Sequence, residues 1–465
     1  MNTFLLLLLA VSADPVATMR IDYLHSGSRT SELFALEQVV VEALPFPGNL
    51  ERPVDATLRG KYLFEIVGND GEIAWSRSFS SIYGEWETTA EARQIQRSFH
   101  ESVRFPAQNK PFTLVIKKRD ARNDFQPVWR LPVDPADVLV HHESAPYVDE
   151  VVAIRQSGKP GSKVDLLLLG DGYTAGETEA FIERARELTA ALFATSPFKE
   201  RAEDFNVWAL APVSRQSGIS RPSTGIYRDT PLGTTYDAFR SERYVLTFDN
   251  KSLRRVASSA PYDFIEILTN TETYGGGGIY GLYSTAAANS RWAEYLFIHE
   301  FGHHFAGLAD EYYTSSVAYE PSDITVEPYA PNVTALLNPD ELKWKHLVLP
   351  STPIPTPWPK QEYERHSVAV QARRWKMRED DVPERDMDAL FKDSKDHTDS
   401  LFAAAPHNGK IGAFEGANYS ARGYYRSEQN CLMFTRSATF CRVCADAIEA
   451  VIDEYVLPAV KTDHR

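Results

Sequence analysis

Two histidines and a glutamate in residues 290–313 have the spacing of a catalytic group. The stretch reads SRWAEYLFIHEFGHHFAGLADEYY and places His299 and His303 four residues apart, with Glu300 directly after the first. In a helix, this spacing stacks both imidazoles on one face, one turn apart, where they can bind a single metal ion. Glu300 is rotated by about 100° from that face, so its carboxylate can accept a proton from a water at the metal. The three residues therefore predict metal-assisted hydrolysis.

The residues around this motif indicate a largely buried helix. Its apolar members are too many for a solvated surface helix: Trp292, Tyr295, Leu296, Phe301 and Phe305. An unpaired imidazole is costly in such surroundings, so metal binding is favoured over the alternative of two core histidines. Asn289 or Ser290 is expected to cap the start of the helix, and Gly307 can adopt the left-handed conformation that ends it.

Two acidic residues, Asp310 and Glu311, follow the predicted turn and are candidates for a third metal ligand. Carboxylate oxygens complete zinc sites to which two histidines contribute. His304 lies about 100° from the ligand face of the same helix and is expected to pack or to meet solvent. The expected ligand set is therefore His299, His303 and one of the two carboxylates.

The first part of the chain is rich in short alternating segments, which are typical of β-strands. A tight Asn-Asp-Gly turn at residues 69–71 joins two of them and predicts a hairpin. We expect a small all-β sandwich domain over residues 19–150, with no catalytic constellation of its own. The composition shifts near residues 156–162, which marks the expected domain boundary.

The second part of the chain alternates strands and helices. Residues 164–169 form a nearly continuous apolar run, typical of a strand that is covered on both faces. A capping box at residues 174–177 predicts a helix after it, and further strands are expected at 205–213 and 264–268. Strand–helix–strand alternation predicts an α/β sandwich, here a catalytic domain over residues 160–465.

Four consecutive glycines, residues 275–278, precede a short predicted strand at residues 279–284. The Gly-Lys-Ser/Thr of a phosphate-binding loop does not follow them, so a nucleotide is not expected. A glycine-rich turn into a short strand suits an open sheet edge, whose free N–H and C=O groups can bind an extended peptide. A polypeptide partner is therefore expected along residues 279–284.

Beyond the motif, the sequence predicts a long loop and then a helical lobe. Five prolines within ten positions exclude helix and sheet in the loop: Pro350, Pro353, Pro355, Pro357 and Pro359. The charged, helix-favouring stretch at about 361–405 predicts two helices broken near Pro383, over or beside the cleft. His366 and His397 lie on this lobe and are expected at the surface.

All three cysteines of the chain lie close together: Cys431, Cys441 and Cys444. A disulfide from Cys431 to Cys441 or Cys444, with one thiol left over, is the expected arrangement for an exported chain. A zinc site is the alternative, but three cysteines would need a fourth ligand that the local sequence does not offer. Met433 lies in the apolar turn that the cysteines flank.

Composition and charge exclude several kinds of partner. The 465 residues are 43% hydrophobic and 24% charged, and the formal charge of −15 argues against nucleic acid or an anionic membrane. Residues 1–13 contain a short apolar run that ends in Val-Ser-Ala, as a cleaved signal peptide does. No other long apolar stretch predicts a membrane span. The mature protein is expected to be secreted or periplasmic.

Five stretches of the chain carry a resemblance to a known family. They are HEFGHHFAGLADEYY from His299, Leu-Gly-Asp-Gly-Tyr-Thr from Leu169, the glycine run, GAFEGANYSARGYYR from Gly412, and Cys-Leu-Met followed by Cys-x-x-Cys. Together they resemble the IgA-peptidase-like family of secreted bacterial zinc metallopeptidases, over roughly residues 163–450. The resemblance implies a zincin-like α/β catalytic domain with one Zn²⁺ per chain, preceded by an N-terminal β-domain. It also implies that Met433 floors the metal site, as the methionine turn of metzincins does.

The metzincin spacing favours Asp310 over Glu311 as the third ligand. In that pattern the glycine lies three residues after the second histidine, and the third ligand lies three after the glycine. Here Gly307 lies four residues after His303 and Asp310 lies three after Gly307, so the second interval is kept. Glu311 stays the alternative, because its longer side chain can compensate for the extra position.

These residues predict a secreted zinc-dependent endopeptidase. The metal would polarise the scissile carbonyl, and Glu300 would act as the general base that takes a proton from water. Tyr424 and Tyr425 are candidates to stabilise the oxyanion. Two alternatives stay open. One is a zinc amidase that acts on cell-wall peptides, and the other is a catalytically silent, metal-stiffened binding or adhesion protein, which would not need Glu300.

Overall fold

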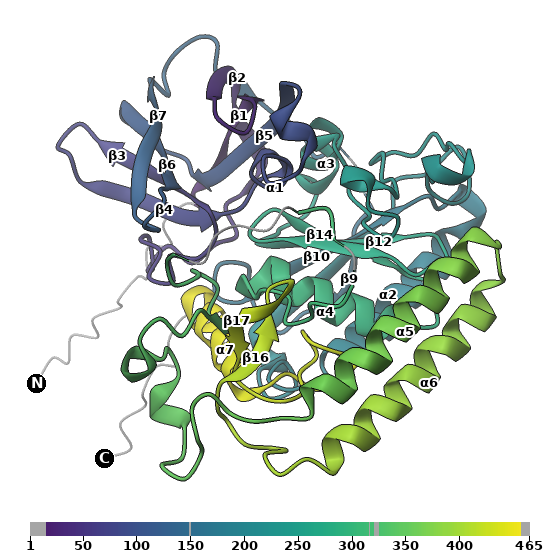
Figure 1. The fold of residues 1–465 in the computed structure, drawn as a ribbon. Helices are drawn as coiled ribbons and strands as arrows, with labels where there is room; N and C mark the ends of the chain where they lie inside the picture. The colour runs from purple at the N-terminus through teal and green to yellow at the C-terminus, as the bar shows by residue number, and fades with distance from the viewer. Residues whose placement is uncertain (1–14, 148–149, 316, 320–324, 457–465) are drawn as a thin grey trace, which may run out of the picture.

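The computed structural model of the protein describes residues 15–147, 150–315, 317–319 and 325–456. The predicted signal peptide at residues 1–13 lies outside the described residues. An all-β region comes first in the chain, and a mixed α/β region with several sheets follows it (Figure 1). This order agrees with the order of fold classes predicted from the sequence.

Two four-stranded sheets form the N-terminal region. One has the order β5-β1-β2-β8, with β1 Ala17–Gly27, β2 Glu32–Pro45, β5 Arg97–Pro106 and β8 His141–His142. The other has the order β4-β3-β6-β7, with β3 Tyr62–Gly68, β4 Ile73–Phe79, β6 Phe112–Arg119 and β7 Phe125–Val133. The sheets bury one common core, to which Ile21, Phe64 and Phe105 belong, as in a β-sandwich. The predicted turn joins β3 to β4, with Gly71 at a φ of 88°.

A six-stranded sheet in the order β13-β14-β12-β10-β11-β9 is the centre of the α/β region. Its strands are β9 Val152–Arg155, β10 Val164–Asp171, β11 Phe205–Leu210, β12 Phe264–Thr269, β13 Gly276–Ile279 and β14 Tyr283–Ala287. β10 pairs parallel with β11 and β12, and β12 pairs parallel with β14. The two outermost strands, β9 and β13, pair antiparallel with their neighbours.

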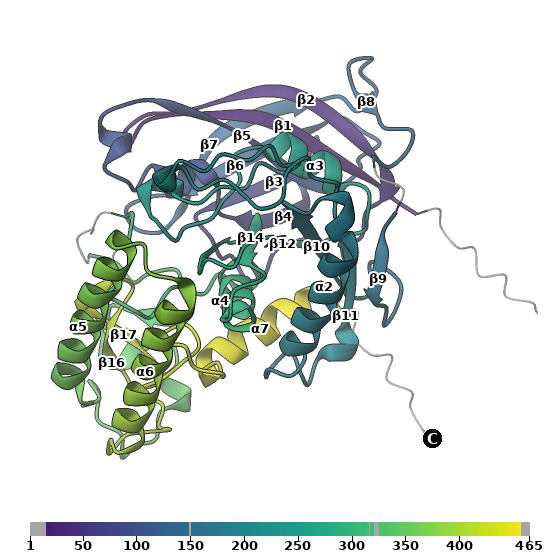
Figure 2. The same ribbon diagram turned by 90° about the vertical axis from the view of Figure 1, so that its right-hand side faces the viewer.

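Both faces of this sheet are covered, which explains the continuous apolar run of β10. The helices of the region include α2 Thr178–Leu192, α3 Asn250–Ala257, α4 Ala293–Ala306 and α7 Arg442–Tyr455. Leu166 and Leu168 belong to a core shared with α2, α4 and α7. Leu167 and Leu169 belong to a second core, shared with α3 and with the N-terminal region. Figure 2 shows the N-terminal strands on one side of the sheet and α4 and α7 on the other.

The predicted helical lobe consists of α5 (Lys360–Glu379) and α6 (Glu384–Ala403). Pro383 separates the two helices, as the sequence predicted, and they lie side by side at the edge of the molecule (Figures 1 and 2). Arg378 Nε lies 2.9 Å from Glu242 Oε1, so an ion pair ties α5 to the loop before α3. A small sheet of β15 Val333–Thr334, β16 Phe414–Ala417 and β17 Ser420–Arg426 lies near the lobe.

The helix that carries the two histidines begins later than predicted. α4 starts at Ala293, and its N-cap residue Trp292 makes no side-chain cap bond. Neither Asn289 nor Ser290 is therefore the cap, and Ser290 Oγ accepts a hydrogen bond from the N–H of Trp292 instead (3.3 Å). The helix ends at Gly307 with a φ of 60°, as the sequence predicted.

The strand predicted at residues 279–284 is two strands. The chain turns at Gly281, whose φ is 68°, so β13 ends at Ile279 and β14 begins at Tyr283. β14 lies inside the sheet, between β13 and β12. The expected edge for a polypeptide therefore needs correction, because of these two strands the glycine-rich β13 lies at the edge and β14 does not.

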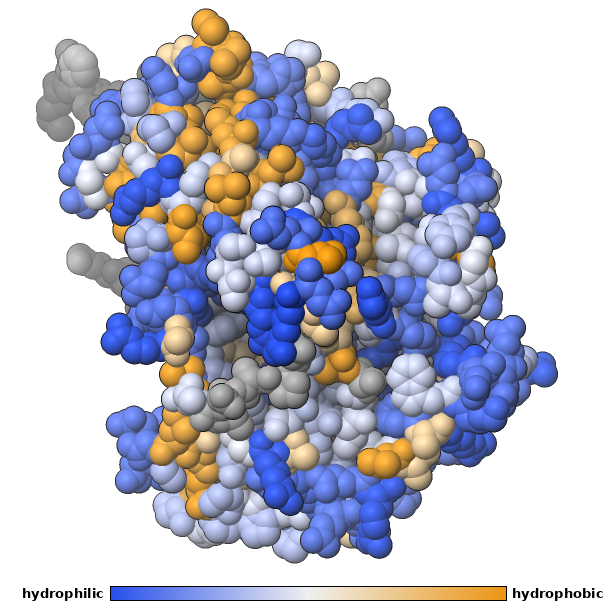
Figure 3. Space-filling view, turned by 45° about the horizontal axis from the view of Figure 1, so that its top comes forward, coloured by the Kyte–Doolittle hydropathy of each residue, from blue (hydrophilic) through white to orange (hydrophobic). Residues whose placement is uncertain are grey.

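The surface differs between the two ends of the molecule. Figure 3 shows hydrophobic residues gathered at the upper end, over the N-terminal strands, and hydrophilic residues over the α5–α6 lobe. The exposed leucines of β1 and β2 include Leu24, Leu33 and Leu36. On the lobe, His397 is exposed as predicted and stacks on the half-buried His366, with ring centroids 3.8 Å apart. Within the described ranges, no helix is long and apolar enough to cross a membrane.

Candidate metal centre

Helix α4 lies between the helical core and the edge of the sheet. Its side chains Phe301 and Phe305 are buried in that core. His304, on the sheet side, donates from Nδ1 to the carbonyl of Ile279 (3.0 Å) and accepts at Nε2 from the N–H of Ile265 (3.1 Å). Burial lowers the pKa of His304 to about 3. Both of its ring nitrogens are used, so His304 packs as a neutral structural residue.

His299, His303 and Asp310 converge on one point. The Nε2 atoms of the two histidines lie 3.3 Å apart. Asp310 Oδ1 lies 3.1 Å from His299 Nε2 and 3.2 Å from His303 Nε2. Zinc–nitrogen bonds of about 2.0–2.1 Å in a tetrahedron place neighbouring ligand atoms about 3.3 Å apart, so this spacing fits one zinc ion.

Backbone carbonyls orient both imidazoles toward that point. His299 Nδ1 lies 3.1 Å from the oxygen of Leu432, and His303 Nδ1 lies 2.6 Å from the oxygen of Leu308. A carbonyl only accepts, so each Nδ1 carries the hydrogen and each Nε2 can offer its lone pair to a cation. Two neutral imidazoles and a carboxylate are a donor set that zinc prefers, and the residues present therefore fit this metal.

The charges of the three groups depend on one another. Burial raises the pKa of Asp310, but His303 and His299 outweigh it and hold that pKa well below its usual range. Burial lowers the pKa of His303, but the Asp310 carboxylate outweighs it and raises this pKa to about 9. A metal cation would replace the proton on His303 as the counter-charge of the buried carboxylate.

The two candidate third ligands point in different directions after the turn at Gly307. Asp310 faces the histidines with Oδ1, and its Oδ2 accepts a hydrogen bond from the hydroxyl of Tyr419 (2.6 Å). Glu311 is fully buried, and its Oε1 lies 3.4 Å from Cys444 Sγ in a separate cluster. The structure brings Asp310, and not Glu311, to the histidine pair.

Glu300 faces the sheet edge from α4. Its carboxylate is half-buried in the wall of a cavity, and burial raises its pKa. A Cβ added to Gly276 would lie 3.3 Å from Glu300 Oε1, and one added to Gly278 would clash with the Glu300 backbone and lie 2.8 Å from His303 Cβ. β13 thus lies directly against the face of α4 that carries Glu300, and the glycines permit this approach.

A cavity of about 700 Å³ adjoins the cluster of His299, His303 and Asp310. The N-terminal region contributes Lys61, Glu85 and Thr88 to its lining, and the β16–β17 hairpin contributes Tyr419 and Tyr424. The N-terminal region therefore forms part of the cleft. Its sequence, which showed no catalytic constellation, did not indicate this.

Tyrosines that the sequence did not indicate as site residues contact the cluster. Tyr424 lines the cavity, whereas Tyr425 is not among the described residues that do. The hydroxyl of Tyr419 donates to Asp310 Oδ2, and the hydroxyl of Tyr295 lies 3.2 Å from His299 Nδ1. The ring of Tyr312 stacks on that of His299, with centroids 6.3 Å apart.

Tyr419 is positioned by a tight turn between β16 and β17. Asn418 and Tyr419 have φ values of 49° and 62°, as in a two-residue hairpin turn. Their N–H groups donate to the carbonyls of Asp310 (2.9 Å) and Tyr312 (3.1 Å). The Asn-Tyr pair between two strand-like segments is the sequence signal that could have located this contact.

The turn around Met433 lies beneath α4, in the position that the family resemblance implied. Met433 is fully buried, and a Cβ added to Gly302 of α4 would lie 3.1 Å from its sulfur. The cysteines beside it are all free and buried. Cys431 Sγ and Cys444 Sγ lie 3.8 Å apart, whereas a disulfide requires about 2.0 Å. The expected pairing of Cys431 with Cys441 or Cys444 is therefore wrong.

Comparison with known proteins identifies the class. Residues 152–452 match the family described as IgA Peptidase M64, and residues 14–130 match the Peptidase M64 N-terminus. The chain belongs to the IgA peptidase M64 family. A peptidase family implies hydrolysis of a polypeptide substrate. No curated protein matches the chain.

We predict that Gly278→Ala damages the centre, because the new methyl group has to displace either β13 or α4. Overpacking of this kind costs about 1–3 kcal/mol. Melting temperature and zinc affinity should both fall. Gly176→Ala is the control, because nothing lies within 4 Å of a Cβ at that position. Equal behaviour of the two variants would contradict the close approach of β13 to α4.

Proposed function

We propose that the protein is a secreted zinc-dependent endopeptidase with a zincin-like catalytic domain. The observation that carries this proposal is the convergence of His299, His303 and Asp310 beside Glu300 at a large cavity. Membership of a peptidase family supports it. In this proposal, residues 19–150 form a β-sandwich domain that walls the cleft, and the catalytic domain spans residues 160–465.

Each residue of the cluster has its own task. His299, His303 and Asp310 would hold a zinc ion, which when bound polarises a carbonyl and lowers the pKa of a water. Glu300 faces the cavity from the next position on α4, where it takes a proton from the attacking water and gives it to the leaving amine. Tyr419 keeps the Asp310 carboxylate in place through its hydrogen bond.

The edge of β13 is where we expect the substrate to bind. Gly276 is already covered, because its N–H donates to the carbonyl of Arg243 and its carbonyl accepts from the N–H of Val245 (both 3.1 Å). Gly278 is the next residue whose backbone N–H and C=O point to the same side of β13 as those of Gly276, and it lines the cavity. An extended polypeptide can add backbone hydrogen bonds at Gly278, which places its scissile bond alongside α4.

The carbonyl oxygen of the substrate also needs a donor. Of the two tyrosines that the sequence indicated, Tyr424 keeps this role in the proposal, because it lines the cavity. Tyr312 is a second candidate, since it lines the same cavity and the Arg243 guanidinium donates to its hydroxyl oxygen. That bond leaves the hydroxyl hydrogen available for an oxyanion.

Two alternative functions use the same residues. A catalytically silent adhesion protein would not need a carboxylate at Glu300 facing the cavity. A zinc amidase of cell-wall peptides would need every feature described. An assay of the purified protein on casein and on peptidoglycan distinguishes this amidase from the proposed endopeptidase. The proposal requires cleavage of casein, and activity on peptidoglycan alone would favour the amidase.

We predict that Glu300→Gln lowers turnover at least about a hundredfold, the low end for loss of a general base. The amide keeps the shape of the side chain, so fold and zinc content should not change. Glu294→Gln is the matched control, because Glu294 is an exposed residue of the same helix. If Glu300→Gln digests casein at the parent rate, Glu300 is not the base.

We also predict that Tyr419→Phe weakens zinc binding about tenfold, because groups that orient a ligand typically contribute 10–100-fold to affinity. Asp310→Ala, which removes the ligand itself, should weaken binding more. Competition with a chromophoric chelator measures both. Tyr425→Phe, on the strand β17 that follows the turn, serves as the control and should bind zinc like the parent. Parent-like affinity in Asp310→Ala would refute the ligand assignment.

A further inference from the structure

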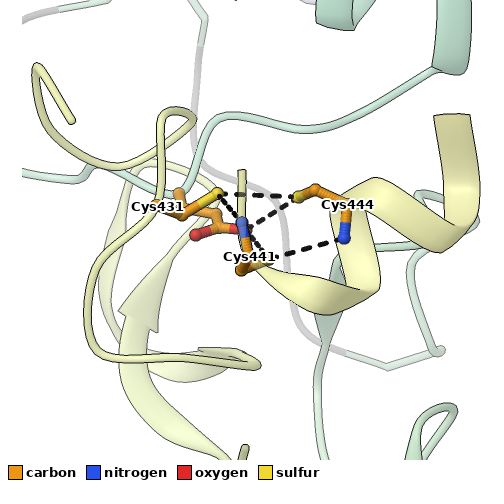
Figure 4. A group of neighbouring side chains, drawn as sticks. Cys431, Cys441 and Cys444 are labelled. Carbon is orange, nitrogen blue, oxygen red and sulfur yellow. Dashed lines mark hydrogen bonds between the residues drawn. The ribbon is translucent and has the colours of Figure 1, made fainter. Parts of the chain in front are cut away.

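A second group of metal-binding side chains lies behind the first. It consists of Glu311, Cys431, Cys441 and Cys444, whose ligand atoms all lie within 4.8 Å of one another. The exposed fraction is 2% for Cys441 and 0% for the other three. Figure 4 shows the three cysteine side chains pointing toward one another. None of these residues lines the cavity, so the group has no access to the substrate.

The spacing of the sulfurs fits a metal and not a covalent bond. Cys431 Sγ and Cys444 Sγ lie 3.8 Å apart. Zinc–sulfur bonds of about 2.3 Å in a tetrahedron place two sulfurs about 3.8 Å apart. Cys444 Sγ lies 3.4 Å from Glu311 Oε1, and Cys441 Sγ lies 3.9 Å from the same oxygen.

Hydrogen-bond donors surround the sulfurs. The backbone N–H groups of Met433 (3.5 Å) and Cys441 (3.2 Å) donate to Cys431 Sγ. Cys441 Sγ accepts from the N–H of Cys444 (3.4 Å) and from the hydroxyl of Ser427 (3.2 Å). Cys441 is also the N-cap residue of α7, where the helix dipole favours negative charge. Donors and dipole both stabilise thiolates, which are the form that binds metal.

Glu311 is incompletely paired without a cation. Its Oε1 accepts from Asn332 Nδ2 (3.0 Å), but its buried Oε2 has no hydrogen-bond partner among the described residues. The buried guanidinium of Arg426 adds positive charge nearby, yet its Nη atoms donate to the backbone carbonyls of Gly416 (2.6 Å) and Gln429 (3.2 Å). An unpaired carboxylate oxygen in the interior is costly, and a metal ligand bond removes that cost.

We propose that Glu311, Cys431, Cys441 and Cys444 bind a second, structural zinc ion. Four protein ligands close the coordination shell and leave no position for water, which is typical of structural and not catalytic zinc. Soft thiolates select zinc over magnesium or calcium. The fourth ligand is distant in sequence from the cysteines, and for this reason the cysteines alone did not predict the site.

The second ion would fix the elements that build the first centre. Glu311 follows Asp310 directly, and its N–H donates to the carbonyl of Met433 (2.9 Å). Cys431 begins the turn that contains Leu432, whose carbonyl orients His299. A shared metal would therefore join the Asp310 loop, the Met433 turn and α7. This consequence rests on the proposed function of the first centre, whereas the second site itself does not.

Metal analysis and cobalt substitution of the purified full chain test the site. The parent protein should contain two zinc ions per chain. After cobalt has replaced all the zinc, the protein should show a sulfur-to-cobalt charge-transfer band in the near ultraviolet. A His₂Asp centre does not produce this band. One ion per chain without this band, or a disulfide among the three cysteines in non-reducing peptide maps, would overturn the proposal.

Variants assign the two ions separately. Cys444→Ser and Glu311→Gln should each bind cobalt at the second site at least tenfold more weakly and weaken the band, and Glu341→Gln is the exposed control. His299→Ala should lose one ion and keep the band. If Cys444→Ser fails to fold, the parent measurement still decides. If the parent protein binds two ions and shows the band but does not cleave polypeptides, only the proposed function is contradicted. If it cleaves polypeptides but binds one ion and shows no band, only the second site is contradicted.

Discussion

The buried carboxylate of Asp310 is the constraint on which the rest of the site depends. It is only 5% exposed, and a charge at such a position needs partners of opposite charge or strong hydrogen bonds. His299 and His303 meet Oδ1, and Tyr419 meets Oδ2. Each partner comes from a different part of the fold. Pairing of the Asp310 carboxylate therefore requires that α4, the turn after it and the β16–β17 hairpin take defined positions relative to one another.

A second constraint is steric. The face of α4 that carries Glu300 lies so close to the edge of the sheet that a side chain at Gly276 or Gly278 of β13 would collide with it. The same approach brings the cavity, the sheet edge and Glu300 together. The N-terminal region completes the arrangement, because it covers the other face of the sheet and supplies Lys61 and Glu85 to the cleft. Its packing thus belongs to the formation of the site as well as to stability.

The two candidate metal-binding groups lie on either side of one loop, which contributes a residue to each. Asp310 and Glu311 are neighbours, but their side chains serve opposite sides of the loop, one toward the cavity and one toward the cysteines. A closed structural ion behind an accessible centre would restrain the loop without competing for substrate. This division would also explain why a peptidase of this size keeps three thiols unbonded and fully enclosed.

Local patterns predicted much of this arrangement. The spacing of His299 and His303, the continuous apolar strand and the break at Pro383 are periodic or local signals, and each located its element. The errors arose where distant segments meet. The sequence could not show that Glu311 lies against the cysteines or that Tyr419 lies against Asp310, because these contacts join residues more than 100 positions apart.

The dependence on distant contacts also explains why the predicted disulfide is wrong. An odd number of cysteines within 14 positions is chemically ambiguous, and only the tertiary structure shows that a carboxylate lies among them. The edge strand was misplaced for a different reason. A run of glycines predicts a turn, whereas in the structure Gly276–Ile279 form β13, packed closely against α4. The distance between a helix and a strand cannot be predicted from one sequence.

Anomalous diffraction at the zinc absorption edge, from crystals of the parent protein grown without chelator, would locate the metal. We expect an anomalous peak about 2.0–2.2 Å from the Nε2 atoms of His299 and His303 and from a carboxylate oxygen of Asp310. Crystals of fully active protein with no peak at this position, or with the metal bound without Asp310, would contradict the proposed metal centre.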